Sequence, residues 1–367
     1  MKTTTIILTF LGFSTLSFAQ IPVDTMPHNK NVLLEEYTGV TCTACPQGHI
    51  EINNLIATYP NKVFAAGLHS ASVGHTTPYG NDENLARTFP DLLRPKIFNL
   101  FGIPGGIINR RMNNGGVEFF IFNPYSTYHS KIDSAINTNI NEASPFNIGI
   151  VANYDTVNKI LYINSQTYTT INKSSTYKLH VFITQSNILV SQLDGSTVIP
   201  NYNQKHVFRE IITPTWGATL YPTGTTKGDI FNSTVTYSNS AKNYKMQDVE
   251  VLVFITDNSV TTNSKGQIVQ VMGAHVNMMG TTAGINENAN SNQISIYPNP
   301  SSNQFFVHLT NPSLNNEVII CDINGKVVLR KQVSNENNFS VNHELAPGVY
   351  FLSVKNNPGV VKKLVVQ

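Results

Sequence analysis

The sequence predicts an α/β domain followed by two all-β domains. A chain of 367 residues is longer than one hydrophobic core usually supports, because single cores stop growing at about 250–300 residues. Residues 32–68 read in the order strand, Cys-x-x-Cys, helix and strand, which is typical of an α/β domain. Residues 145–280 and 293–367 alternate apolar and polar positions between turn signals, as β-sandwiches do. We therefore expect an α/β domain over residues 20–144 and a β-sandwich in each of the other two regions.

The composition limits the classes of function. Charged residues make up 13% of the chain, against about 25% in an average protein. The 24 Lys and Arg and the 22 Asp and Glu leave a net charge of +2, which excludes a strongly basic nucleic-acid-binding surface and a charge-rich disordered chain. The 45 Asn residues suit strands and turns better than helices. No nucleotide-binding motif is present, so we expect neither a nucleic acid partner nor a cofactor.

The first 19 residues have the pattern of a secretory signal peptide. Lys2 gives the positive start, residues 6–18 are mostly apolar, and Ser17-Phe18-Ala19 has the small-x-small form that signal peptidase recognises. We therefore predict a signal peptide over residues 1–19 and export of the mature chain. No later run is apolar over 18 residues, so no transmembrane helix is expected. Export also permits disulfide bonds.

The two cysteines nearest the N-terminus carry the chemistry that the sequence predicts. Residues 32–37 read as a strand, residues 47–59 as a helix and residues 63–68 as a second strand. Cys42 then lies at the N-terminus of the helix, where unpaired N–H groups and the helix dipole stabilise a thiolate. Cys45 follows one turn later, close enough to resolve a mixed disulfide. This placement favours a redox-active dithiol.

The same segment resembles the thioredoxin fold. The resemblance implies that Cys42 is the exposed nucleophile and Cys45 the buried resolving thiol. Glu36, six residues before Cys42, falls where that family has a buried acid that assists proton transfer. Phe101-Gly102-Ile103-Pro104 resembles the loop whose cis-proline faces the disulfide, so Pro104 would position the backbone of a client protein. The resemblance thus implies a thioredoxin-like domain that acts as a thiol-disulfide oxidoreductase on protein thiols.

Two other interpretations of the cysteine pair stay open. The pair can be a structural disulfide in a surface adhesion protein, with ligand binding left to the central β-sandwich. It can also help to carry copper or zinc, because thiolate and imidazole ligands suit both ions. The candidates for a third metal ligand are His49, His69 and His75. The cysteine spacing counts against the metal interpretation, because the copper-delivery proteins of the thioredoxin fold that Cys45-Pro46 resembles have three residues between their cysteines and this chain has two.

Residues 145–280 read as a β-sandwich of immunoglobulin-like shape. The predicted strands are residues 147–154, 160–168, 177–183, 249–255 and 268–275. Residues 185–204 form a long polar connection, which suits a binding loop. We interpret Trp216 as partly buried packing rather than a platform for sugar stacking. Structural roles are also expected for His206 and Arg209.

Residues 293–367 form a β-rich tail after a small polar linker at residues 281–292. The tail contains Tyr297-Pro298-Asn299-Pro300, the hairpin signal Asn324-Gly325 and the turn sequence LAPGVY, ahead of a basic and apolar end. In this order the motifs closely resemble the type A C-terminal sorting domain of the type IX secretion system. The resemblance implies passage across the outer membrane of a diderm bacterium, with the secretion machinery as a partner. Cys321 reads as a buried thiol in a strand of this tail.

Two stretches outside the tail resemble the 28-kilodalton outer membrane protein family. They are VLLEEYTGVTCTACPQGH at residues 32–49 and HVFREIITPTWG at residues 206–217. The resemblance covers roughly residues 30–280. It implies an exported protein that is held at the outer membrane or cell surface, or released outside the cell.

Overall fold

The computed structural model describes residues 23–97, 102–113, 116–124, 128–258, 266–279, 294–309, 316–322, 326–333, 336–354 and 357–367. The chain forms two compact units, one up to Thr281 and one from Thr282 onward. The signal peptide predicted at residues 1–19 and the linker predicted at residues 281–292 lie outside the described residues. The other predicted domain boundaries stay predictions.

The first unit combines three α-helices with fourteen strands in its described residues. The helices are α1 (Cys45–Thr58), α2 (Thr88–Ile97) and α3 (Tyr128–Ile140), and a short 3-10 helix spans Met246–Asp248. The strands are β1 (Val32–Thr38), β2 (Val63–His69), β3 (Gly105–Asn113), β4 (Gly116–Ile121), β5 (Phe146–Asp155), β6 (Ile160–Thr169), β7 (Tyr177–Gln185), β8 (Ile188–Asp194), β9 (Thr197–Gln204), β10 (Val207–Ile211), β11 (Ala218–Tyr221), β12 (Ile230–Ser238), β13 (Val249–Asp257) and β14 (Gln267–Met279).

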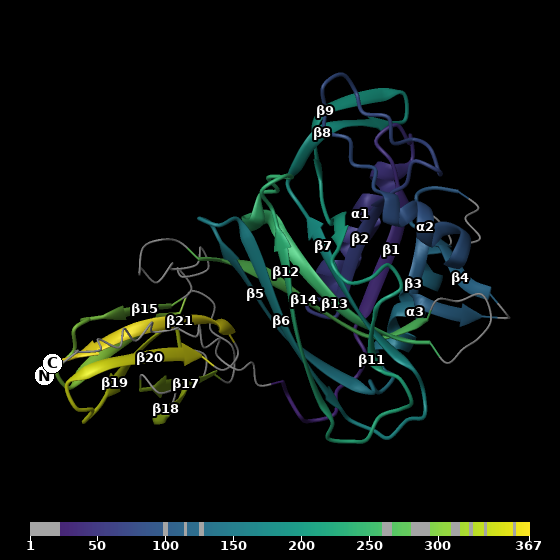
Figure 1. The fold of residues 1–367 in the computed structure, drawn as a ribbon. Coiled ribbons are helices and arrows are strands. Elements are labelled where there is room, and N and C mark those ends of the chain that lie inside the picture. The colour runs from purple at the N-terminus through teal and green to yellow at the C-terminus, as the bar shows by residue number, and fades with distance from the viewer. Residues whose placement is uncertain are drawn as a thin grey trace, which may run out of the picture. The chain divides into compact units, whose positions relative to one another are not determined.

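Twelve of these strands form one sheet. Its order is β12-β6-β5-β14-β13-β7-β10-β2-β1-β3-β4, and β11 pairs with β7 beside this path (Figure 1). The remaining two strands, β8 and β9, pair with each other in a separate hairpin.

The N-terminal part of the sheet is buried on both faces. β1 and β2 run parallel on either side of α1 in the sequence, and every residue of both strands is buried. Because side chains alternate along a strand, neighbouring residues enter different cores. Leu34 packs with α1 and α3, whereas Leu33 packs with aromatic residues of β7, β10 and β13. Parallel strands that are covered on both faces read as continuous apolar runs, which is what the sequence shows here.

The prediction of an α/β thioredoxin-like domain followed by two separate immunoglobulin-like sandwiches is wrong. The structure is mostly β, and the first strands belong to the same large sheet as the central strands. Val207 of β10 pairs in parallel with Gly67 of β2. Phe89 of α2 contacts Phe182 and Phe208, with ring centroids 5.1 and 5.2 Å apart. The physical reason is a shared core: the second apolar face of β2 is covered by aromatic residues of the central strands.

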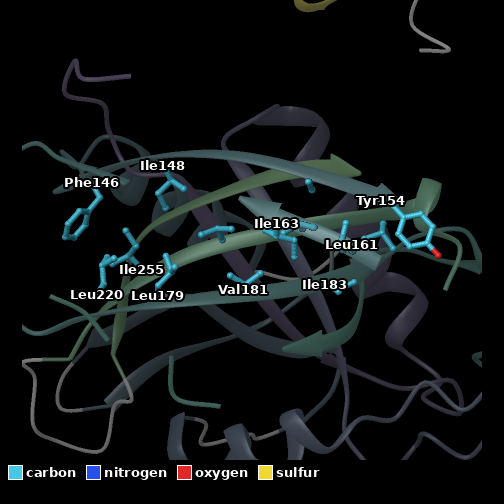
Figure 2. Packing of buried hydrophobic residues seen from close by; sticks show 14 of the residues in the cluster. Phe146, Ile148, Tyr154, Leu161, Ile163, Leu179, Val181, Ile183, Leu220 and Ile255 are labelled. Carbon is cyan, nitrogen blue, oxygen red and sulfur yellow. The ribbon is translucent and has the colours of Figure 1, made fainter. Parts of the chain in front are cut away.

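A second core lies between two layers of the same sheet. Figure 2 shows Ile148 and Ile163, from β5 and β6, near Val181 and Ile183 of β7. β14 connects the layers, because its first part pairs antiparallel with β13 and its last four residues, Val276–Met279, pair parallel with β5. Each of the five strands predicted between residues 147 and 275 lies within an observed strand, so these predictions are confirmed.

The second unit is all-β. Its strands are β15 (Ile294–Tyr297), β16 (Gln304–Leu309), β17 (Asn316–Cys321), β18 (Val327–Val333), β19 (Asn338–Asn342), β20 (Gly348–Val354) and β21 (Asn357–Val366). They form two sheets, β15-β16-β19 and β18-β17-β20-β21. Side chains from both sheets, including Phe305, Val318 and Leu364, share one core. The predicted hairpin signal Asn324-Gly325 lies outside the described residues.

Candidate functional site

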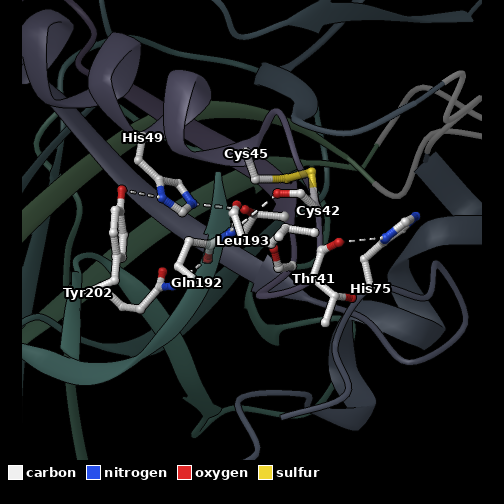
Figure 3. The surroundings of a disulfide bond; sticks show 11 residues. Thr41, Cys42, Cys45, His49, His75, Gln192, Leu193 and Tyr202 are labelled. Carbon is white, nitrogen blue, oxygen red and sulfur yellow. Dashed lines mark hydrogen bonds between the residues drawn. A yellow bond between two sulfur atoms is a disulfide. The ribbon is translucent and has the colours of Figure 1, made fainter. Parts of the chain in front are cut away.

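A disulfide joins Cys42 and Cys45 at the start of α1, with the two Cα atoms 5.4 Å apart (Figure 3). Pro46 suits the first turn of this helix, where a missing N–H leaves no hydrogen bond unmade. Ala44 at the N-cap makes no side-chain cap, and the first turn contains no acidic residue. No side chain of the helix therefore neutralises the positive end of the helix dipole, which lies beside the cysteine pair.

The side chains of Glu36 and Pro104, the other two predicted site residues, both lie close to Gly48 of α1. A Cβ atom at Gly48 would lie 2.5 Å from Glu36 Oε1 and 2.5 Å from Pro104 Cβ. The Ile103–Pro104 peptide bond is cis and directly precedes β3. Gly48 follows Cys45 by three residues, so it lies on the same side of α1 as that cysteine. The structure thus gathers the four predicted site residues around one end of α1, while their chemical roles stay predictions.

Glu36 is a carboxyl group held in the interior. It is 2% exposed, and its Oε1 atom has no hydrogen-bond partner among the described residues. Burial raises the pKa of Glu36 well above its ordinary value of 4.5, because the charged form loses its hydration. The neutral acid is therefore favoured, and it holds a proton that it can donate.

A small pocket lies beside Glu36. Its lining includes His49 and Asn53 of α1, Asn203 of β9, Lys205 and His206. The His49 ring is held at both nitrogens, since Thr38 Oγ1 lies 2.8 Å from Nε2 and the Tyr202 hydroxyl lies 2.9 Å from Nδ1. Burial lowers the pKa of His49 and of His206 from 6.5 to about 4 in each case. Both imidazoles are therefore neutral near pH 7.

The β8–β9 hairpin covers the loop that contains the disulfide (Figure 3). The Leu193 N–H donates to the Val40 carbonyl at 2.8 Å, and the Gly195 N–H donates to the Thr43 carbonyl at 2.9 Å. Cys42 is only 4% exposed in this arrangement. The exposed nucleophile that the sequence implied is thus buried in the oxidised protein.

This hairpin replaces the long polar connection predicted at residues 185–204. Few positions of this segment are apolar and buried. Ile188 and Val190 are two that pack in one cluster with Val40. One signal was present: Gly195-Ser196, the two residues between β8 and β9, is a two-residue turn signal between β-prone runs. That dipeptide would have indicated the hairpin, although not the loop on which it lies.

The three histidines considered as metal ligands have other environments. His49 contacts Thr38 and Tyr202, and His75 Nδ1 lies 3.2 Å from the Thr41 carbonyl oxygen. His69 is buried. Within the described ranges, no group of three or more His, Cys, Asp or Glu side chains is arranged to hold a metal ion. The geometry therefore gives no support to copper or zinc carriage.

Three further residues can be compared with their expected roles. Trp216 is partly buried against the core between α2 and the sheet, which confirms the packing interpretation. Arg209 donates to the Glu83 carboxylate at 2.7 Å, and its guanidinium lies 4.2 Å from the centroid of the Tyr244 ring. These contacts give Arg209 a structural role. Cys321 is a free thiol at the end of β17, partly exposed rather than buried as predicted.

The tail defines the class of protein. Residues 295–367 match the secretion system C-terminal sorting domain. The protein is therefore exported by the type IX secretion machinery, with which its tail interacts, and it is located at the cell surface or outer membrane. None of the helices in the described ranges has the length and hydrophobicity of a membrane span.

The chain belongs to the outer membrane protein Omp28 family, which matches residues 94–279. This range begins after the cysteine pair, so membership alone assigns no role to the disulfide. HBP35 of Porphyromonas gingivalis has a similar fold, with a TM-score of 0.53 at 17% identity over 92% of this chain and 98% of that one. Protein AGR_C_4864 from Agrobacterium tumefaciens gives a TM-score of 0.40 at 12% identity, over 70% and 98% of the two chains. No curated protein matches the chain.

Proposed function

We propose that this exported protein exchanges thiols and disulfides with protein clients through Cys42 and Cys45. The supporting observation is the gathering of three features at one end of α1: the disulfide, the buried acid Glu36 and Pro104. A purely structural disulfide needs neither an uncapped helix N-terminus nor a buried carboxyl whose Oε1 atom has no hydrogen-bond partner among the described residues. The helix N-terminus stabilises the thiolate of a nucleophilic cysteine, and the buried carboxyl can protonate the thiolate that leaves.

The exchange begins with a client thiolate that attacks Cys42 Sγ. The Cys42–Cys45 bond breaks, Cys45 leaves as a thiolate, and a mixed disulfide joins the client to Cys42. A second client thiolate then attacks the client sulfur of this mixed disulfide and releases Cys42 as a thiolate. The client is oxidised from a dithiol to a disulfide, and the Cys42–Cys45 disulfide is reduced to a dithiol. With a client disulfide and a reduced pair, the same steps run in reverse.

Glu36 donates the proton that the leaving Cys45 sulfur needs. Burial keeps its carboxyl neutral in the resting state. Its Oε1 atom lies against α1 at Gly48, one turn beyond Cys45. In the reverse direction the carboxylate takes the proton back from Cys45 and so favours attack by that thiol. Pro104, whose Cβ also lies close to Gly48, positions the client backbone in this proposal.

The test is the reduction of insulin by dithiothreitol, with and without the mature full-length protein. We expect the wild type to accelerate the reaction and Cys42→Ser to abolish the acceleration. Glu36→Gln should slow it by about 100-fold, because general acid–base catalysis contributes at least that much. Cys321→Ser serves as the control and should leave the rate unchanged. A wild-type protein that leaves the rate at the level of dithiothreitol alone would overturn the proposal.

A second candidate function is surface binding, with the disulfide as a structural link. The observation that favours it is burial, since Cys42 is 4% exposed and Cys45 is fully buried. In this case a ligand on a glycan or peptide array would bind equally well to the wild type and to Cys42→Ser. The full chain is needed for this test, because the central strands share a sheet and a core with β1 and β2. Failure of the wild type to bind any array member would count against it.

A further inference from the structure

We infer that the β8–β9 hairpin shields the disulfide loop, and that it must move away before Cys42 can react. This inference rests on the proposed thiol-disulfide exchange. It assigns to the hairpin the part of a cover over the loop at residues 39–43, which a client must displace to reach Cys42.

Two backbone hydrogen bonds join the hairpin to the loop that contains the disulfide. The Leu193 N–H in β8 donates to the Val40 carbonyl, and the Gly195 N–H in the turn between β8 and β9 donates to the Thr43 carbonyl. Cys42 is only 4% exposed beneath this cover. A client thiolate that attacks Cys42 therefore needs the hairpin to move first.

Gln192 fixes the hairpin in this position. Its side chain is fully buried, and Nε2 donates to the Gly39 carbonyl at 3.2 Å and to the Cys42 carbonyl at 3.3 Å (Figure 3). Its Oε1 atom accepts a hydrogen bond from Gln204 Nε2 at 2.7 Å. The two glutamines thus tie both strands of the hairpin to the loop that carries the nucleophile.

The hairpin pairs separately from the rest of the unit. Its two strands bond to each other and lie outside the twelve-stranded sheet, and a two-stranded hairpin is only marginally stable by itself. Asn187 and His206, just outside its two ends, turn the chain out of β7 and back into β10. The strand pairing of β8 and β9 is therefore not part of the hydrogen-bond ladder of the large sheet.

The experiment measures how fast dithiothreitol reduces the Cys42–Cys45 disulfide of the full-length protein. The test variant is the double substitution Gln192→Met and Gln204→Met, which removes both amides together and leaves neither unpaired. We expect its reduction to be faster by about tenfold, since hydrogen bonds to two carbonyls are lost. The control is Leu189→Ser, on the outer, 59% exposed side of the same hairpin, and it should react like the wild type.

A second variant at the surface provides an independent test in case the double variant does not fold. Asp82 Oδ2 accepts a hydrogen bond from the Ser191 N–H at 2.7 Å, so Asp82→Ala loosens the hairpin from outside the core. Faster reduction in either folded variant supports the inference. Rates equal to the wild type in Asp82→Ala and in a folded double variant overturn it, and if the double variant does not fold, Asp82→Ala alone decides.

The same variants separate this inference from the proposed function. Reduction by dithiothreitol requires no protein client, so the hairpin can be shown to shield the disulfide even if insulin is not a substrate. If insulin reduction is catalysed but the variants are reduced at the wild-type rate, the exchange reaction stands and the shielding hairpin is rejected. Amide hydrogen exchange at Leu193 and Gly195 should rise in the double variant, and unchanged exchange there would also contradict the inference.

Discussion

Arg110 and Glu35 form an ion pair in the interior of the first unit. Arg110 Nε lies 2.7 Å from Glu35 Oε2, and Nη2 lies 2.6 Å from Oε1, so both carboxylate oxygens are engaged. The side chains are 1% and 0% exposed. The guanidinium also lies 5.3 Å from the centroid of the Phe254 ring on β13. The pair therefore links β1 and β3 to the central strands.

We expect Arg110→Met to lower the free energy of unfolding by about 3–5 kcal/mol, because it leaves the Glu35 charge buried without a partner. The matched control is Arg111→Met, next in the chain, whose pair with Glu142 is about one-third exposed on both sides. That substitution should cost less than about 1 kcal/mol. Urea unfolding of the three proteins measures both values. Equal losses for the two variants would show that burial of the Arg110 pair is not decisive.

Gly48 is predicted to be intolerant of even one methyl group. A Cβ atom there would lie 2.5 Å from Glu36 Oε1 and from Pro104 Cβ, and both neighbours belong to buried strands or their ends. Although Ala is favoured over Gly in a helix by about 1 kcal/mol, overpacking should outweigh this gain and leave Gly48→Ala destabilised by about 1–2 kcal/mol. At Gly67 the nearest atom would be 3.6 Å away, so Gly67→Ala is the control. A more stable Gly48→Ala protein would contradict the packing argument.

Local patterns in the sequence predicted local structure well. The run from Val32 to Tyr37 is observed as β1, and the helix expected over residues 47–59 is observed as Cys45–Thr58. The apolar periods of the central strands and the motifs of the tail were equally informative. These features depend on neighbours within a few residues, which is the range over which side-chain periodicity and turn preferences act.

The arrangement of these elements was not predictable from the same patterns. The large sheet continues from β2 to β10 through the pairing of Gly67 with Val207, which are 140 positions apart. No periodicity in either strand specifies that partner. The position of the β8–β9 hairpin over the disulfide loop was unpredictable for the same reason. Leu193 contacts Val40 through backbone N–H and C=O groups, and these groups carry no information about the side chain. The residues predicted for the site lie near one another, their roles stay predictions, and the hairpin over the disulfide loop was not predicted.

Reduction of the disulfide is expected to destabilise the protein only modestly. The bond closes a loop of four residues, from Cys42 to Cys45, and chain entropy for so short a loop gives about 2 kcal/mol. The free energy of unfolding should therefore fall by about that amount on reduction. The control Cys321→Ser, which lacks the free cysteine, should show the same difference between its oxidised and reduced forms. A loss near 5 kcal/mol would instead indicate a disulfide whose main task is structural.

Acid should destabilise the fold through His69, at the end of β2. The side chain is 2% exposed, and neither ring nitrogen has a hydrogen-bond partner among the described residues. Burial, aided by the neighbouring charges of His49, Arg87 and Arg209, lowers the pKa of His69 from 6.5 to about 3. Between these values the unfolded chain binds a proton that the folded chain does not. The stability that this histidine contributes is therefore complete above about pH 6.5 and is lost as the pH falls.

At pH 5 the expected loss from His69 is about 2 kcal/mol, which is 1.36 kcal/mol for each unit below 6.5. His69→Phe keeps a ring at this site and removes the titration. We therefore expect the difference in unfolding free energy between pH 7 and pH 5 to shrink by about 2 kcal/mol in the variant. The remaining pH dependence belongs partly to His49 and His206, whose pKa values are also lowered. Urea unfolding at both pH values measures the difference, and parallel losses in wild type and variant would show that His69 is already protonated in the folded protein at pH 5.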